Sequence, residues 1–188
     1  RGYTMQVLRS SGPLETAFSA RKFKNLSFGK DFHKQFSQNY GKTIPVAIIC
    51  EDLPEKHNSV ELDHNKKDSS GMPGVKINYK LSENSKKMLV HGLSKAKEVM
   101  KKIGAKSIMS FGPVRHTGWH LMGTTKMGNS RKESVVNEFG QTHDIKNLVI
   151  VDSSIFVTSG GVNPVSTLQA VALKITSEIK NSPNRYFI

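Results

Sequence analysis

One segment near the C-terminal third of the chain contains residue types that could do chemistry. Residues 119–128 read Trp-His-Leu-Met-Gly-Thr-Thr-Lys-Met-Gly, with His120 in a stretch broken by glycine and without helical or strand periodicity. A segment of this kind buries no regular face, which favours a binding or catalytic role. Taken alone, it is equally well explained as a glycine-rich turn with an ordinary histidine.

A second candidate segment follows the apolar run of residues 147–151. The run ends in Asp152, and residues 158–167 read Thr-Ser-Gly-Gly-Val-Asn-Pro-Val-Ser-Thr. A strand that ends in an acid, followed by small residues that open a helix, is a common arrangement for holding a ligand at strand ends. The free backbone N–H groups of the helix start suit an anion. The simpler interpretation is that Asn163 caps a helix beginning at Pro164 and that Asp152 ends a strand.

His116 and His120 lie four residues apart, the spacing of two metal ligands on one helical turn. The zinc-protease pattern also needs a glutamate directly after the first histidine, and Thr117 stands there. Gly118 and Pro113 also argue against a regular helix at this point. We therefore expect no metal site.

Taken together, the two segments resemble the C-terminal signature of the glucose–methanol–choline (GMC) oxidoreductase family. The matching residues run from His120 to about Ile179, and residues 63–104 resemble the strand, turn and helix that precede this signature. They are His120, Gly123, Thr124, Met127, Gly128, Val135-Val136-Asn137, Gly140, Asn147-Leu148, Ile150, Asp152, Ser154, Asn163-Pro164, Thr167, Ala170 and Ala172. Two departures are Asn137, where the family often has Asp, and Phe156-Val157, where it often has Pro. The sequence Thr-Ser-Gly-Gly-Val-Asn-Pro around Asn163 is more similar to bacterial dehydrogenases of sugars, sugar acids or other alcohols than to fungal glucose oxidases.

The resemblance implies an FAD-dependent enzyme that oxidises a CH–OH group of an alcohol, sugar, sugar acid or choline-like substrate. His120 would take the hydroxyl proton while hydride passes to flavin N5, and Asn163 would orient the substrate oxygen. The start of the last helix would face the flavin pyrimidine edge. The family's FAD contacts fall on Asp152, Ser153, Asn163, Pro164, Val165 and Thr167. A quinone or cytochrome is a possible electron acceptor.

The dinucleotide fingerprint Gly-x-Gly-x-x-Gly does not occur in the sequence. We therefore expect a C-terminal fragment whose principal partner is the missing N-terminal FAD-binding half of the same protein, and which is inactive alone. The alternative is a non-enzymatic basic module that retains the fold and binds an anionic partner through its lysines.

Composition sets wider limits. The formal net charge is +13, but the lysines are spread over loops and one helical face without an aromatic platform, so no nucleic acid is expected. Cys50 is the single cysteine, which leaves no internal disulfide possible. No run approaches the roughly 18–20 apolar residues of a membrane span, so we expect a soluble protein of the bacterial cytoplasm or periplasm.

The elements that would position the two segments are mixed in type. Residues 82–103 are typical of an amphipathic helix, with Ser82 as N-cap and Gly104 just past its end. The last helix begins near Asn163-Pro164, with an apolar stripe through Ile175. Strands are expected at 44–49, 60–62, 75–79, 106–109 and 148–151, and residues 1–42 are expected to be irregular. The predicted class is α+β, with a mainly antiparallel substrate-domain sheet in residues 1–144. Residues 145–188 would return to an FAD-binding α/β domain that is mostly absent.

Overall fold

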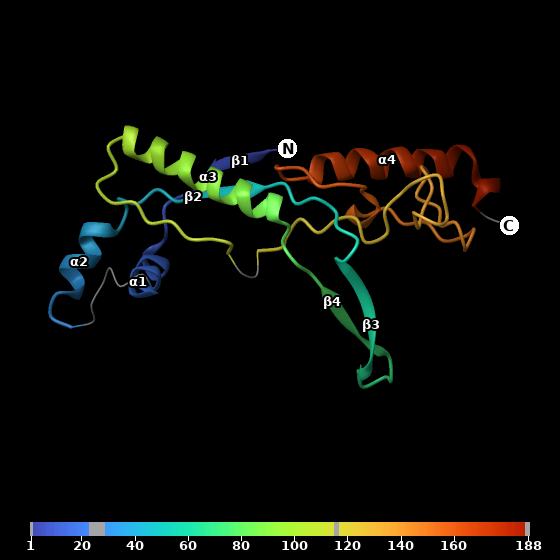
Figure 1. The fold of residues 1–188 in the computed structure, drawn as a ribbon, viewed down its shortest axis with the longest axis horizontal. Helices are drawn as coiled ribbons and strands as arrows, with labels where there is room; N and C mark the ends of the chain where they lie inside the picture. Colours follow the sequence, from blue (N-terminus) through green and yellow to red (C-terminus); the bar gives the residue numbers. More distant parts are fainter. Residues whose placement is uncertain (1, 23–28, 115–116, 187–188) are drawn as a thin grey trace.

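The computed structural model describes residues 2–22, 29–114 and 117–186, and it confirms an α+β chain with antiparallel strand pairs. The molecule is elongated (Figure 1). Helices α1 (Pro13–Lys22) and α2 (Phe32–Asn39) lie at one end, and α4 (Val165–Asn181) lies at the other. Within the described residues, no helix has the length and apolar run needed to cross a membrane.

The middle of the molecule is a two-stranded sheet covered by a helix. Strand β1 (Tyr3–Val7) pairs antiparallel with β2 (Val46–Cys50), and α3 (Glu83–Lys102) packs on both strands. The caps of α3 agree with the sequence, because the Ser82 side chain accepts from the Ser85 backbone N–H and Gly104 has a φ of +83°. Its close approach depends on Gly92, where a Cβ atom would lie 2.7 Å from Cγ2 of Ile48.

The buried stripe predicted for this helix is only partly formed. Val99 and Ile103 are 51% and 63% exposed, although Leu89, Leu93, Ala96 and Met100 are half-buried. A two-stranded sheet is too narrow to cover the whole apolar face of a helix of this length.

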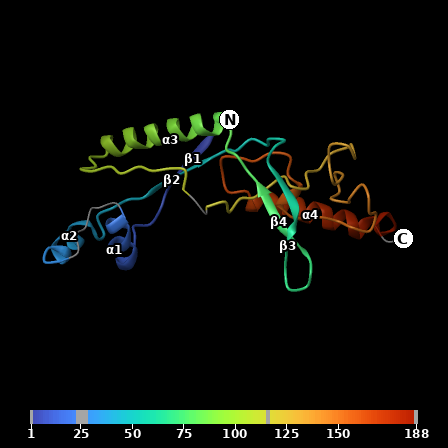
Figure 2. The ribbon, with the colours of Figure 1, turned by 60° about the horizontal axis from the view of Figure 1, so that its bottom comes forward.

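A long hairpin projects from the middle of the molecule (Figures 1 and 2). It consists of β3 (Ser59–Lys67) and β4 (Pro73–Asn78), which are both longer than the strands predicted from the sequence. The tip is held by Asp68, whose Oδ1 accepts from the backbone N–H groups of Ser70 and Met72. This turn is the central part of the polar stretch of residues 65–74.

The prediction that residues 1–42 are irregular is wrong. They contain β1, α1 and α2, and the rings of Phe36 and Tyr40 stack at an i, i+4 spacing along α2. The apolar residues of both helices are few: Leu14 and Phe18 of α1 are 73% and 64% exposed, and Phe32 and Phe36 of α2 are half-buried. Because neither helix buries a regular stripe, hydrophobic periodicity gave no signal for them.

The C-terminal part has a small core of its own. Val136, Ile155 and Ile175 are buried together, with Met127, Val149, Ile150, Phe156, Val171 and Ile179 packed around them. The one-turn helix η1 (Ser153–Ile155) supplies Ile155, and η2 (Pro183–Arg185) follows α4.

Residues 148–151 do not form the buried strand that the sequence predicts. Only Val149 makes a bridge, to Gln141, while Leu148 and Val151 are 45% and 39% exposed. A strand apolar on both faces needs neighbours and cover on both faces, and the described residues supply one bridge and cover only Val149 and Ile150. Residues 106–109 are likewise outside any strand.

The chain exposes more surface to solvent than a compact protein of the same length. The accessible surface is 14215 Å², whereas a compact monomer of this length has roughly 9,000 Å². The hairpin shows this most clearly, because Leu62, Val75 and Ile77 are 61%, 69% and 70% exposed. Apolar surface of this extent marks an interaction surface.

Gly140 offers a test of the C-terminal core. Its φ is +70°, and a Cβ atom there would lie 2.5 Å from the Ile150 carbonyl oxygen and 3.0 Å from Cδ1 of Ile175. We expect Gly140→Ala to cost about 2–4 kcal/mol of stability, because backbone strain and overpacking add. Gly104→Ala is the matched control, since its φ is +83° but its Cβ position is open; it should cost about 1 kcal/mol. Thermal unfolding measures both, and equal losses would contradict the close contact at Gly140.

Candidate active site

The His120 loop is held against η1 by a short ladder of backbone hydrogen bonds. The backbone N–H groups of Thr125 and Met127 donate to the carbonyls of Ser154 and Ile155 at 2.9 and 2.8 Å. The Ser153 hydroxyl donates to the Leu121 carbonyl at 2.7 Å, one residue after His120. The loop therefore has a defined path although it has no regular secondary structure.

Asp152 organises η1 rather than the loop itself. Its Oδ1 accepts from the Ser154 backbone N–H at 2.7 Å, so the carboxylate is the N-cap of η1. Hydrogen bonds from the Ser154 side chain and backbone hold the pKa of Asp152 below its usual value. The carboxylate therefore stays ionised and fixed in place.

His120 and Asn163 meet although they are 43 residues apart. Nδ2 of Asn163 lies 3.2 Å from Nε2 of His120, a distance at which the amide donates to the ring nitrogen. The sequence predicted both residues as the catalytic pair, and the fold brings them together. His120 is half-buried, whereas Asn163 is exposed.

Gln6 is a third member of this cluster that sequence reasoning missed. Its Nε2 donates to Oδ1 of Asn163 at 2.6 Å across 157 positions of the chain. Gln6 is a single polar residue in an ordinary strand, so neither its spacing nor its surroundings distinguished it.

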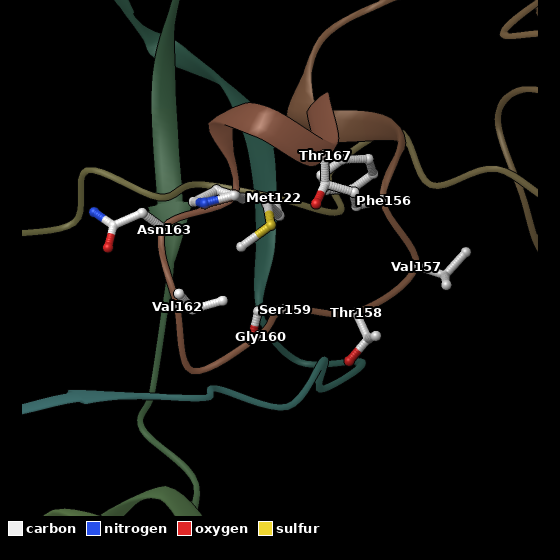
Figure 3. A pocket seen from close by; sticks show the side chains of 10 residues that line it. Met122, Phe156, Val157, Thr158, Ser159, Gly160, Val162, Asn163 and Thr167 are labelled. Atoms are coloured by element: carbon white, nitrogen blue, oxygen red, sulfur yellow. The ribbon is translucent and has the colours of Figure 1, made fainter. Parts of the chain in front are cut away.

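A cavity of about 330 Å³ lies next to the start of α4. Figure 3 shows Met122 reaching into the middle of the lining residues, with Asn163 on one side and Phe156 and Thr167 on the other. The other lining residues are Val157, Thr158, Ser159, Gly160, Val162 and Pro164. No side chain caps the start of α4, because its N-cap residue is Pro164. The first-turn N–H groups are thus left for a polar or anionic ligand.

The cavity wall is tied to the rest of the chain at Asp52. Its backbone N–H donates to the Ser159 hydroxyl at 3.0 Å, and Ser159 lines the cavity. The Asp52 carboxylate accepts from the Ser85 hydroxyl at 2.7 Å and from the Tyr79 hydroxyl. One residue therefore joins the ends of β2 and β4, the start of α3 and the loop before α4.

The predicted cofactor residues divide into two groups. Asn163, Pro164 and Thr167 line the cavity, whereas Val165 is 54% exposed and is not part of its wall. Asp152 and Ser153 are also outside the wall and form the internal contacts given above. His116 lies outside the described residues; among those described, no group of three His, Cys, Asp or Glu side chains could hold a metal ion.

Comparisons with known proteins identify the family of the chain. The family model for GMC oxidoreductase matches residues 54–172. The 2-methyl-1,2-propanediol dehydrogenase of Mycolicibacterium austroafricanum is 38% identical over 92% of this chain and 32% of its own length. The 6'''-hydroxyparomomycin C oxidase of Streptomyces lividus is 33% identical over 72% of this chain and 25% of its own length. The fructose dehydrogenase large subunit of Gluconobacter japonicus is 26% identical over 81% of this chain and 28% of its own length.

The chain belongs to the GMC oxidoreductase family, and it corresponds to the C-terminal portion of that family. Its relatives include dehydrogenases and oxidases of alcohols and sugars. The chain spans about a third or less of the length of these three relatives.

Tyr79 allows the Asp52 junction to be tested by pH. Partial burial raises the pKa of Tyr79 to about 12, and the hydrogen bond to Asp52 and the charge of that carboxylate act in the same direction. The folded chain therefore keeps the phenol proton when the unfolded chain loses it, so this stabilisation is complete below about pH 10 and falls as pH rises through 12. We expect Tyr79→Phe to be less stable than wild type at neutral pH, with a difference that shrinks above about pH 10. Denaturant unfolding over this range measures it.

Tyr40→Phe is the matched control, because Tyr40 is the C-cap residue of α2 and lies outside the Asp52 junction. Its effect on stability is the reference against which the pH dependence of Tyr79→Phe is compared. A Tyr79→Phe difference that stayed constant up to pH 11 or so would contradict the account given for this hydroxyl.

Proposed function

We propose that this chain forms the substrate-facing part of an FAD-dependent enzyme that oxidises a CH–OH group, with His120 as general base. The observation that carries this proposal is the pairing of His120 Nε2 with Asn163 Nδ2 at 3.2 Å, where Asn163 also lines the cavity at the start of α4. A proton acceptor and an amide donor at one point suit a substrate hydroxyl, which must lose a proton and leave negative charge on oxygen.

Each residue of the pair has a separate task. His120 Nε2 takes the hydroxyl proton, because imidazole can accept and return a proton near neutral pH. Asn163 Nδ2 then donates a hydrogen bond to the oxygen as its negative charge grows, and so favours the transition state over the bound alcohol. In the free enzyme the two groups pair with each other, and the substrate oxygen would replace that contact.

The residues at the start of α4 fit FAD in part. FAD would supply the acceptor for the two electrons released when the alcohol is oxidised. The uncapped first turn of α4 offers N–H groups and a partial positive charge, which suit the electron-rich edge of a flavin ring. At Gly160 a Cβ atom would meet nothing nearer than Val162 Cγ1 at 4.0 Å, so the cavity has room there. We propose Asn163, Pro164, Val165 and Thr167 as its contacts, with Asp152 and Ser153 at its edge.

The remainder of the FAD site would come from an N-terminal half absent from this chain. The relatives are about three times as long or more, since this chain covers 32%, 25% and 28% of them. The exposed apolar side chains after residue 144 suit burial against such a half, and they are Ile145, Leu148, Val151, Val157, Val162, Val165 and Leu173. We propose residues 1–144 as part of the substrate domain and residues 145–188 as the return into the FAD-binding domain.

The substrate class follows from the relatives and remains broad. Their names specify a propanediol, fructose and a hydroxyparomomycin, all of which carry alcohol or sugar hydroxyl groups. We therefore propose an alcohol or sugar as substrate, with a quinone or cytochrome as a possible electron acceptor.

The general-base assignment is tested with His120→Ala in the full-length protein. The rate of alcohol-dependent flavin reduction should fall by about 10²–10⁴-fold, the usual contribution of a general base. Bound flavin, measured by its visible absorbance, should stay at the wild-type level. His64→Ala is the control, since His64 is exposed on the hairpin; it should reduce flavin normally. A near-wild-type rate for His120→Ala would show that another group takes the proton.

The division between two halves is tested with the chain expressed alone. We expect it to bind no FAD and to bind a hydrophobic dye strongly, because its apolar surface is uncovered. Joining it to the N-terminal half should lower dye binding and restore flavin absorbance. Full flavin loading by this chain alone would refute the proposed division.

A further inference from the structure

Gln6 is placed to decide which atom of the Asn163 amide faces His120. Its Nε2 donates to Asn163 Oδ1 at 2.6 Å, and this leaves Nδ2 of Asn163 directed at His120 Nε2 at 3.2 Å. An amide has nearly the same shape on both sides but opposite hydrogen-bonding character, one oxygen acceptor and one N–H donor. Its direction is therefore set by the groups that bind it.

The direction matters for the chemistry of His120. With Nδ2 facing the ring, Nε2 must be an acceptor, and this is the unprotonated form that a base requires. If the Asn163 amide turned over, Oδ1 would face the ring, and Nε2 would have to carry the proton. The turned amide would also present an acceptor to the oxygen of the substrate at the point where negative charge develops.

We propose that Gln6 is a positioning residue that holds the Asn163 amide with its N–H group toward the reacting oxygen and toward Nε2 of His120. This inference rests on the proposed function and adds to it a residue from the opposite end of the chain. Gln6 acts through Asn163 and has no direct contact with the proton being transferred.

Two carboxylates in segments next to this cluster along the chain have partners of their own. Glu51, at the end of β2, accepts from the Gly2 backbone N–H at 3.3 Å, and Asp152 accepts from that of Ser154 at 2.7 Å. Lys126 is exposed further along the His120 loop. Within the part of the chain that the structure describes, neither His120 nor Asn163 pairs with a charged group. Gln6 is thus the polar side chain that binds the Asn163 oxygen.

A double-mutant cycle in the full-length enzyme separates positioning from general damage. Gln6→Leu should lower kcat for alcohol oxidation by about two- to tenfold, the effect of one hydrogen bond, with KM little changed. In an Asn163→Ala background the same substitution should have no further effect, because the group it orients is gone. An undiminished effect of Gln6→Leu in that background would overturn the proposal.

Reversing the polarity of residue 6 gives a sharper test. In Gln6→Glu the side chain can only accept, so Asn163 must turn its Nδ2 toward residue 6 and its Oδ1 toward His120. We expect a larger loss of kcat than in Gln6→Leu, and the acidic limb of the kcat/KM profile should move to higher pH because the turned amide favours the protonated ring. Gln38→Glu on the exposed face of α2 adds the same charge and should behave as wild type.

A measurement that does not depend on turnover is the tautomer of His120, read from the nitrogen-15 shifts of labelled histidines and assigned by difference with His120→Ala. Wild type should show an unprotonated Nε2 at neutral pH, and Gln6→Glu should show a protonated one.

Identical tautomers and identical pH profiles in wild type and Gln6→Glu would refute the role of Gln6 while leaving His120 as the base. If His120→Ala itself kept a normal rate, the proposed function would fail, and the role of Gln6 with it.

Discussion

The candidate site depends on a close contact between the two ends of the chain. A Cβ atom at Gly161 would lie 2.8 Å from the Gly2 carbonyl oxygen and 3.0 Å from Cα of Tyr3, so only glycine allows the loop before α4 to lie against β1 at this distance. This approach brings Gln6 and Asn163 within hydrogen-bonding distance. Without it, Asn163 would have His120 as its one described partner, and its amide would be free to turn.

The two junctions around the cavity have different physical characters. At Gly161 the constraint is steric and comes from backbone against backbone. At Asp52 it is polar, because a single carboxylate accepts from Tyr79 and Ser85 while the adjacent backbone binds Ser159. Both act on residues 159–163, the segment that leads from the cavity into α4. The direction of that helix start, and so of its free N–H groups, is therefore determined from two sides.

The sequence predicted the elements whose signals are local. Helix α3 has its Ser82 cap and its Gly104 end in the expected places, and α4 begins one residue after Pro164. The predictions were wrong for segments whose structure depends on contacts with other parts of the fold. Residues 148–151 are apolar enough for a buried strand but have no strands beside them, and the helices α1 and α2 are short, with few apolar residues.

The residues of the candidate site also differ in whether local sequence could reveal them. The segments of His120 and Asn163 differ in composition from the rest of the chain, and their resemblance to the GMC family marked the two residues; the structure places them in contact. Gln6 and Asp52 were missed because each is one polar residue at a strand, whose partner lies 157 or 107 positions away. Local composition carries no information about such pairings, which come from the path of the whole chain.

The exposure of the candidate site to water weakens its hydrogen bonds. Asn163 is exposed and His120 half-buried, so water competes with their hydrogen bond in this chain. Hydrogen bonds and partial charges have larger effects where water is excluded. Burial of this site against the FAD-binding half proposed above would therefore strengthen the contacts among Gln6, Asn163 and His120. The hydrogen bond between Asn163 and His120 thus depends on how far water is kept from the start of α4.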